Sequence, residues 1–464
     1  MPRLATLLPH ALRRRRPRSP NPLPEQVRAL LAERGEQISD ATRPELGAMY
    51  GSLMADTWTR TLRPGPHGTF VVTGDIEAMW TRDSSAQMRP WLALAAQSEQ
   101  VAAMVGQVVA MQWRLLGHDP VANAFNDGPV GGSHHLLDNH VWAGGADPWI
   151  WERKYELDSL AFPVQLAHAL WRATGGTDHL DDAVHAGIGT LVALWRSEQH
   201  HEDSRYRFIR LDAVLLRRPS DTLSRWGRGP AAGHTGMTWQ GFRPSDDACR
   251  FGYNIPGNLM AAHSLQLAAE LCREVWRDEA LAVDCLALAR EITDGVARFA
   301  QHPQGGWYYE VDGLGGVLEA DDANMPSLLS LPLTAGISPD DPDYLATRGR
   351  ALSPANPWWH QGRVASGIGS PHTPGPRVWP IALAVQGLTS TRIEEKRELA
   401  ELLAATTAGT SMMHESFHVD DPANFTRGWF SWANMMFCEL LDDIAHPRTP
   451  QETPQETPQQ DWSR

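Results

Sequence analysis

Cysteine is scarce in this chain of 464 residues, and a long apolar run is missing. The four cysteines, Cys249, Cys272, Cys285 and Cys438, show no CxxC spacing and lie in or beside apolar helical segments. Such a pattern indicates free thiols in a reducing compartment. No window of the sequence is long and apolar enough to span a bilayer. We therefore expect a cytoplasmic protein without a membrane partner.

Basic charge is also in short supply. Lys and Arg total 41 against 55 Asp and Glu, so the formal net charge is −14. Beyond the first twenty residues no basic cluster of the kind needed to bind phosphates is present, which argues against a nucleic-acid partner. The glycine motifs of nucleotide-binding folds are missing too, and GLGG at Gly313 lies in a predicted hairpin, where it indicates a turn.

The two ends of the chain differ in composition from the rest. In residues 1–22 a short apolar part precedes the main Arg cluster, which is the reverse of a secretory signal. Residues 447–464 repeat PQET and contain too little apolar surface to order themselves. We expect two disordered tails, the first of them basic, around a single folded domain over residues 23–446.

Tryptophan and helical periodicity are abundant. Nineteen Trp stand against seven Tyr, and a flat indole face suits carbohydrate as well as a large helical core. Apolar residues recur at helical spacing over residues 46–62, 84–116, 157–173, 179–198, 255–276, 279–300, 378–388, 393–408 and 426–444. Short strand signals near Phe70, near Tyr206 and from Gly306 predict small hairpins. Paired helices joined by alternately short and long loops predict an all-α ring of helical hairpins.

One candidate binding site lies in GDIEAMWTRDSSAQMRPWL, residues 74–92. An indole can cover the apolar face of a sugar ring while carboxylates and a guanidinium hold its hydroxyls. The candidate residues are Asp75, Trp80, Arg82 and Asp83. The alternative is an ordinary helix start, capped by Asp83 or Ser84 and carrying a charge pair.

The next long loop mixes histidines with acids. His134, His135, Asp138 and His140 suggest a metal site, but HExxH is absent and adjacent histidines point apart, so we expect no metal. The run WERKYELDSL, which contains Glu156 and Asp158, favours a second sugar-facing loop. Either carboxylate could instead cap the following helix.

A third loop supplies a candidate general acid. Asp246 and Asp247 are adjacent and close to Trp239, Phe242 and Phe251, and such surroundings can raise one carboxyl pKa as a general acid requires. A double-Asp helix cap is the alternative.

Two later loops add a candidate base and a histidine. Glu415 lies between His414 and Ser416, with Arg427, Trp429 and Trp432 further on, and such donors would keep a carboxylate ionised and able to activate water. His372 lies in a loop rich in Gly and Pro, where it could bind a hydroxyl or merely be a satisfied loop histidine.

Five blocks of this chain, in order, resemble glycoside hydrolase family 125, the metal-independent exo-α-1,6-mannosidases. They span roughly residues 44–441 and read TGDIEAMWTRDSSAQMRPWL, WERKYELDSL, GFRPSDDACRFGYNIPGN, GIGSPHTP…VWPIAL and MHESFH…FTRGWFSWAN. The resemblance implies an (α/α)6 barrel that removes terminal α-1,6-linked mannose from an α-mannoside oligosaccharide with inversion, using no metal and no other cofactor.

The same resemblance assigns roles to residues. The general acid would be Asp246 or Asp247, with Asp246 favoured, and the base would be Glu415. The substrate-binding candidates are Asp75, Trp80, Arg82, Asp83, Glu156, Asp158, Arg243 and His372. Two other functions stay open: an inverting glycosidase for another sugar, and a glycan-binding protein without catalysis. A lectin has no need of an opposed acid and base, which speaks against the second.

Overall fold

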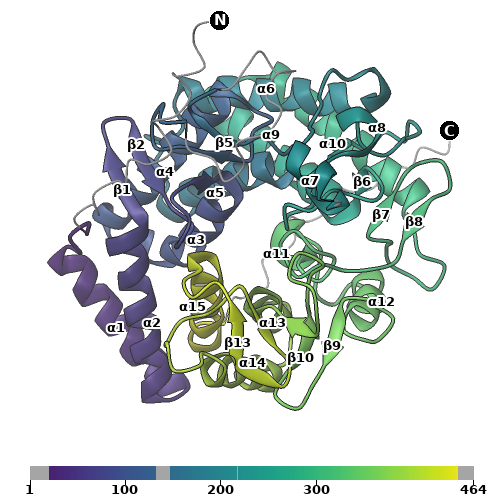
Figure 1. The fold of residues 1–464 in the computed structure, drawn as a ribbon. Helices are drawn as coiled ribbons and strands as arrows, with labels where there is room; N and C mark the ends of the chain where they lie inside the picture. The colour runs from purple at the N-terminus through teal and green to yellow at the C-terminus, as the bar shows by residue number, and fades with distance from the viewer. Residues whose placement is uncertain (1–19, 132–146, 217, 448–464) are drawn as a thin grey trace, which may run out of the picture.

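The helices of this protein form two concentric rings (Figure 1). The computed structural model describes residues 20–131, 147–216 and 218–447. The inner ring consists of α3 (Thr81–Ala95), α5 (Asp158–Thr174), α9 (Ile255–Leu271), the short α11 (Leu331–Thr334), α13 (Pro380–Leu388) and α15 (Ser431–Ala445). The outer ring consists of α2 (Pro44–Asp56), α4 (Glu99–His118), α6 (Asp182–Glu198), α10 (Glu279–Phe299), α12 (Pro342–Ala351) and α14 (Ile393–Ala405).

The chain alternates between the two rings, and α15 closes the inner ring by packing on α3. This is an (α/α)6 barrel, as expected. An additional helix, α1 (Glu25–Ala41), packs on α2 and α15, so the first and last described helices lie side by side.

Burial explains which helices lie inside. Every residue of α13 except Gln386 is buried, and α15 is buried on nearly all sides, as expected for helices enclosed by others. By contrast, α10 buries one stripe, at Ala282, Cys285, Leu288, Ile292 and Val296. One continuous hydrophobic cluster runs from Val27 to Ile444 and joins both rings.

The predicted helices are present, with differences at their ends. The segment 84–116 is two helices, because Ser98 caps α4 by accepting a hydrogen bond from the amide of Val101. Helix α3 begins at Thr81 after Trp80, so Asp83 lies within its first turn and the predicted cap at Asp83 or Ser84 is wrong. Helix α15 begins at Ser431 because the chain before it forms a strand. Helices α1 and α12 were missed because each buries only a few residues.

All strand pairs are short and antiparallel. Hairpin β1 (Leu62–Gly65) with β2 (Gly68–Val71) and hairpin β7 (Glu310–Val311) with β8 (Val317–Leu318) confirm two predictions. The remaining strands are β3 (Met79–Trp80), β4 (Ala124–Phe125), β5 (Ile150–Glu152), β6 (Tyr253–Asn254), β9 (Trp359–Gln361), β10 (Ser366–Ile368), β11 (Arg377–Val378), β12 (Ser416–His418) and β13 (Asp421–Thr426). The hairpin predicted near Tyr206 is wrong: the Tyr206 hydroxyl is buried against the backbone of Arg153 and Tyr155 instead.

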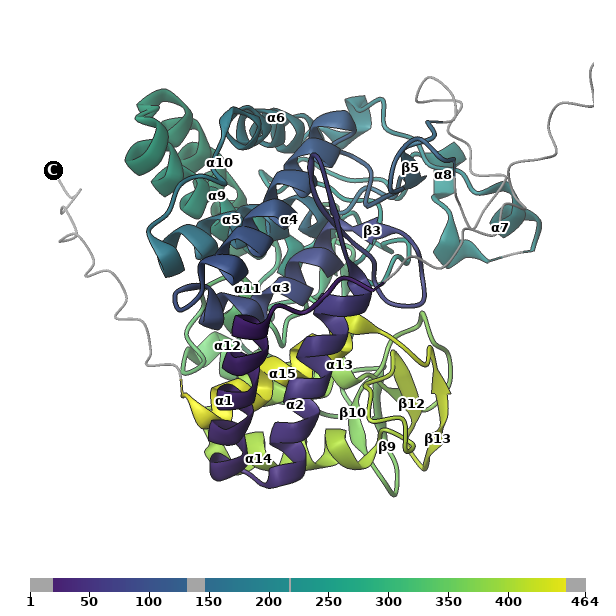
Figure 2. The ribbon, with the colours of Figure 1, turned by 90° about the vertical axis from the view of Figure 1, so that its left-hand side faces the viewer.

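The strands lead into the inner helices. Strands β3 and β6 end directly before α3 and α9, and β11 ends one residue before α13. In Figure 2, β3, β5, β9, β10, β12 and β13 gather at one end of the ring, together with α7 (Leu211–Leu215) and α8 (Ser224–Gly227). The N-termini of the inner helices therefore meet the loops that carry the candidate site. Within the described residues, no helix has both the length and the apolarity to cross a bilayer.

The contact of α1 with α2 yields a stability prediction. A Cβ on Gly47 would lie 2.1 Å from the carbonyl oxygen of Gly35. Gly47→Ala should therefore force the two helices apart and lower the free energy of unfolding by about 1–3 kcal/mol. Gly51→Ala, on the same helix with nothing within 4 Å of its new Cβ, is the matched control and should be neutral or stabilising. Equal unfolding temperatures for the two variants would contradict this packing.

Candidate active site

A cavity of about 270 Å³ lies where inner helices α3, α13 and α15 begin. Its wall is formed by aromatic, charged and small polar side chains from loops that are distant in the sequence. They are Thr73, Ile76, Trp80, Arg82, Asp83, Pro244, Ser245, Asp246, Asn324, His372, Trp379, Glu415, Arg427, Phe430 and Trp432.

Two carboxylates from separate loops line this cavity, Asp246 and Glu415. Asp246 has a φ of 64°, and its amide donates to the carbonyl oxygen of Arg243 at 2.9 Å. Asp tolerates this left-handed conformation better than most residues. In this turn, adjacent Asp246 and Asp247 have different surroundings. Asp247 is buried, is not part of the cavity wall, and its Oδ1 lies 3.7 Å from Nδ1 of His372.

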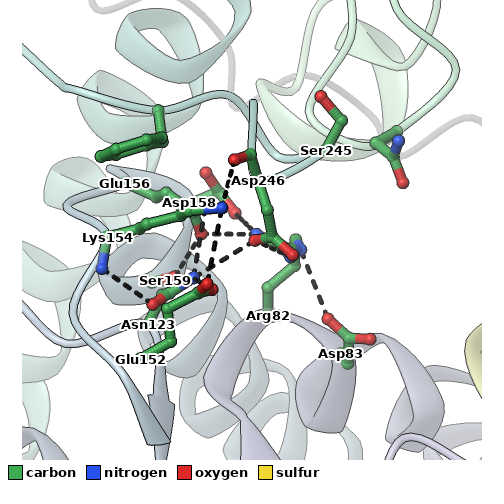
Figure 3. A network of polar contacts seen from close by, with 12 residues as sticks. Arg82, Asp83, Asn123, Glu152, Lys154, Glu156, Asp158, Ser159, Ser245 and Asp246 are labelled. Atoms are coloured by element: carbon green, nitrogen blue, oxygen red, sulfur yellow. Dashed lines mark hydrogen bonds and ion pairs between the residues drawn. The ribbon is translucent and has the colours of Figure 1, made fainter. Parts of the chain in front are cut away.

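Arg82 fixes the position of Asp246 (Figure 3). Its Nη2 donates to Asp246 Oδ1 at 3.2 Å, while its Nη1 donates to Glu156 Oε2 at 2.6 Å and Asp158 Oδ2 at 3.1 Å. The guanidinium is buried, and an unpaired buried charge is costly, so these carboxylates hold it in place. Glu156 and Asp158 thus lie behind the cavity wall. Neither caps α5, whose N-cap is Leu157 and has no side-chain hydrogen bond.

Two further side chains hold the turn at Asp246. Asn123 Nδ2 donates to Asp246 Oδ1 at 3.2 Å, and Lys154 Nζ donates to the backbone oxygen of Asp246 at 2.7 Å. The Asp246 carboxyl is therefore held through both its side chain and its backbone. The predicted double-Asp helix cap is wrong, because α9 is capped by Asn254.

Arg427, and not a neighbour in sequence, is the partner of Glu415. Nη1 of Arg427 lies 3.6 Å from Glu415 Oε1, and the same guanidinium donates from Nε to Asp75 Oδ1 at 2.9 Å. Arg427 also stacks over Phe430, with its Cζ 4.2 Å from the ring centroid. A cation at this distance favours the ionised form of a carboxylate.

The neighbours of Glu415 in sequence do not hold it. His414 stacks on Phe425 with ring centroids 3.6 Å apart, and its ring nitrogens contact the carbonyl oxygens of Thr407 and Arg427. The hydroxyl of Ser416 bonds that of Thr426 at 2.8 Å. The prediction that His414 and Ser416 support Glu415 is therefore wrong, because their side chains turn toward the strand hairpin.

His372 adds a positive charge to the cavity wall. Burial lowers the pKa of His372. The hydrogen bond and negative charge of Asp247 and, to a smaller extent, the charges of Glu415 and Asp246 outweigh this effect and raise the pKa to about 9. The imidazole is therefore protonated at neutral pH and can donate from both nitrogens.

Several polar groups of the wall lack hydrogen bonds. Among the described residues, Nε1 of Trp80, Nε1 of Trp432, Nε of Arg82 and Oδ2 of Asp83 have no hydrogen-bond partner. The indole nitrogens of Trp91, Trp113, Trp195 and Trp239, which do not line the cavity, lack partners as well, so these atoms alone do not indicate a ligand. Burial raises the pKa of Asp83 to about 6, although the Nε of Arg82 lies 3.4 Å from the carboxylate.

Two candidates lie away from the cavity wall. Arg243 donates from Nε to Glu310 Oε1 at 2.5 Å and lies over the rings of Tyr309 and Trp358, so it anchors its own loop. Asp75 is paired with Arg427.

Sequence reasoning missed other wall residues, namely Thr73, Asn324, Trp379 and Phe430, as well as Asn123 behind the wall. Thr73, Trp379 and Phe430 lie in the blocks that carry the family resemblance, whereas Asn324 and Asn123 lie outside these blocks and are brought in by the fold. The histidines at 134, 135 and 140 and Asp138 lie outside the described residues. Within the described ranges, no group of three or more His, Cys, Asp or Glu could hold a metal.

Known structures share this fold. A bacterial glucoamylase complexed with acarbose superposes with a TM-score of 0.55 at 11% identity, over 86% of this chain and 55% of that one, which is a likeness of fold alone. At the level of family, the match is to the metal-independent alpha-mannosidases (GH125), over residues 43–441. The chain belongs to this family.

Two relatives are similar over most of the chain. A metal-independent alpha-mannosidase of Streptococcus pneumoniae, in a non-productive complex with alpha-1,6-mannobiose, has a TM-score of 0.87 and 42% identity, over 92% of this chain and 99% of that one. The meiotically up-regulated gene 157 protein of Schizosaccharomyces pombe is 35% identical over 428 residues, which is 88% of this chain and 83% of that protein.

The raised pKa of Asp83 predicts a pH-dependent gain of stability on substitution. Its folded pKa of about 6 exceeds the ordinary value of 3.8, so ionising this carboxyl lowers stability as pH rises between these values. Asp83→Asn should therefore stabilise the fold at about pH 8 by up to roughly 3 kcal/mol and by less at about pH 4.5. Thermal unfolding at both pH values tests this. A destabilised variant at the higher pH would contradict it.

Proposed function

We propose that this protein is an exo-acting, inverting α-1,6-mannosidase. The observation that carries the proposal is the presence of two carboxylates, Asp246 and Glu415, from separate loops in one cavity lined by Trp80, Arg82 and Trp432. Membership of the metal-independent α-mannosidases and the α-1,6-mannobiose in the Streptococcus pneumoniae structure support it. The proposed location is the cytoplasm, supported by four buried cysteines without disulfides.

The size of the cavity favours exo action. At about 270 Å³ it lies just below the range of roughly 300–1,000 Å³ that is usual for ligand pockets, so it suits one terminal sugar. Trp80 and Trp432 line the cavity with indole rings, and Arg82 and Asp83 line it with charged groups. A sugar ring presents the same combination of an apolar face and hydroxyls.

The proposed reaction is a single displacement. Asp246 donates its proton to the glycosidic oxygen as the C–O bond breaks, and Glu415 takes a proton from the water that attacks the anomeric carbon from the opposite face. An inverting pair leaves room for that water, with carboxyl groups about 6.5–9.5 Å apart. Arg427 lies beside Glu415 at 3.6 Å, and the indoles and hydroxyl partners position the ring.

Asp246 is the better candidate for the acid because it lines the cavity. Asp247 is not part of the cavity wall, and its carboxylate faces His372. In this account Asp247 keeps His372 protonated and oriented, and His372 donates to a hydroxyl or to the departing sugar. Arg82 and Asp83, which both line the cavity, bind hydroxyls of the mannose in this proposal.

A substrate panel tests this function. The purified protein should release mannose from α-1,6-mannobiose at the same rate with and without EDTA, and much more slowly from α-1,2- and α-1,3-mannobiose. A preference for isomaltose would indicate another glycosidase on the same ring. Binding of mannobiose without turnover would indicate a lectin, and loss of activity with EDTA would contradict the metal-independent assignment.

Substitution of the base should abolish turnover without abolishing binding. Glu415→Gln is expected to lower kcat by a factor on the order of 10³ or more, because the attacking water is no longer deprotonated. Calorimetric titration with α-1,6-mannobiose is the control for an intact site. Unchanged turnover would exclude Glu415 as the base.

Substitution of the acid should depend on the leaving group. Asp246→Asn is expected to lower kcat/KM on α-1,6-mannobiose by about 10²–10⁴ and to affect α-mannosyl fluoride little, because fluoride departs without a proton donor. Asp247→Asn should show no such dependence on the leaving group. The reverse pattern would assign the acid to Asp247.

A further inference from the structure

Glu156 lies directly behind Asp246, in the loop that enters α5. Its side chain is fully buried, whereas that of Asp246 is 23% exposed to the cavity. Asn123 Nδ2 contacts both carboxyls, at 3.4 Å from Glu156 Oε1 and 3.2 Å from Asp246 Oδ1, and Arg82 donates to both (Figure 3). The two carboxyls are therefore held by the same two donors.

The charges around this pair do not balance. Glu152 and Asp221 are matched by Lys154 and Arg210, and although burial raises the pKa of Glu152, the two cations outweigh burial and lower that pKa to about 2. The remaining buried cation, Arg82, faces four carboxyls: Asp83, Glu156, Asp158 and Asp246. Neighbouring titratable groups are Tyr206 and Cys249, with Asp247, His372 and Glu415 on the cavity side. Four ionised carboxylates on one buried guanidinium would be strongly destabilising.

At least one of these carboxyls must therefore keep a proton, and the contacts indicate where. Asn123 Nδ2 and the Arg82 guanidinium each contact both Glu156 and Asp246, so the two carboxyls lie close together, and one proton shared between them lowers the negative charge at this point. Burial raises the pKa of Glu156 well above its usual range, and Asp246 and Asp158 add to this effect against the opposing charge of Arg82.

We propose that Glu156 and Asp246 share one proton, which makes Glu156 a positioning residue for the general acid. This inference rests on the proposed function. The proton leaves the pair when Asp246 protonates the glycosidic oxygen: its O–H bond breaks, an O–H bond forms on the departing sugar, and both members of the pair are left as carboxylates. Glu415 takes a proton from the attacking water; after the product leaves, Glu415 releases this proton to solvent and the pair takes one proton from solvent.

The shared proton has a kinetic consequence. A negative charge on one member of the pair opposes loss of the last proton from the pair. The basic limb of the pH profile of kcat/KM is therefore a property of the Glu156 and Asp246 pair.

Glu156→Gln tests the proposal because it removes the charge and keeps the shape. On α-1,6-mannobiose, the basic limb of kcat/KM should move to lower pH by roughly one unit or more, with about a tenfold loss of activity per unit above it. On α-mannosyl fluoride, which needs no acid, the rate should stay close to that of the wild type. Glu198→Gln is the matched control: Glu198 is also buried and hydrogen-bonded, to His201 and Ser204, but is not part of the cavity wall.

The possible outcomes distinguish failure of the shared proton from failure of the proposed function. An unmoved basic limb in Glu156→Gln, or an equal loss on both substrates, would overturn the shared proton while leaving the proposed function intact. A wild-type protein that hydrolyses neither substrate would overturn the proposed function itself, and the role of Glu156 with it. If Glu156→Gln does not fold, Glu156→Asp should place the limb between the expected position for Gln and that of the wild type, and an unmoved limb would contradict the proposal.

Discussion

The burial of Arg82 is the constraint on which the site depends. Its guanidinium contacts Glu156, Asp158 and Asp246, which are 74, 76 and 164 residues away in the sequence. These contacts tie the start of α3 to the loop entering α5 and to the loop that precedes α9. A buried cation without these partners would be strongly destabilising, so the loops are held together by the charge that also positions the proposed acid. On the other side of the cavity, Arg427 connects Glu415 with Asp75 in the same manner.

The barrel makes this arrangement possible because every long inner helix begins at the same end. Short strands direct the chain into α3, α9 and α13. The hydrophobic core sets the approximate positions of the loops at this end of the ring. Their final positions come from polar contacts, several of which remain unsatisfied at the cavity wall.

Much of the fold followed from helical periodicity, because inner and outer helices carry long apolar stripes. Periodicity did not predict α1, because its buried face is only Val27, Leu31, Gly35 and Ile38. The predicted N-cap of α3 lay too far along the chain. The residues of the site were found as blocks, but most of their partners were not. The sequence places Arg427 near Glu415, as the structure has it, but nothing local predicts that Asn123 contacts Asp246 or that Glu156 lies beside Asp246, since these contacts join distant segments. The strand expected at Tyr206 failed because its alternating pattern reflects burial of single side chains rather than a sheet.

The central claim is a single displacement by Asp246 and Glu415, and the anomer of the first product tests it most directly. Proton NMR should follow α-1,6-mannobiose during the first minutes of hydrolysis, before mutarotation mixes the anomers. Early β-mannose is the predicted result, since water attacks from the face opposite to the departing sugar. Early α-mannose would mean a retaining mechanism, and it would contradict the roles given to both carboxylates.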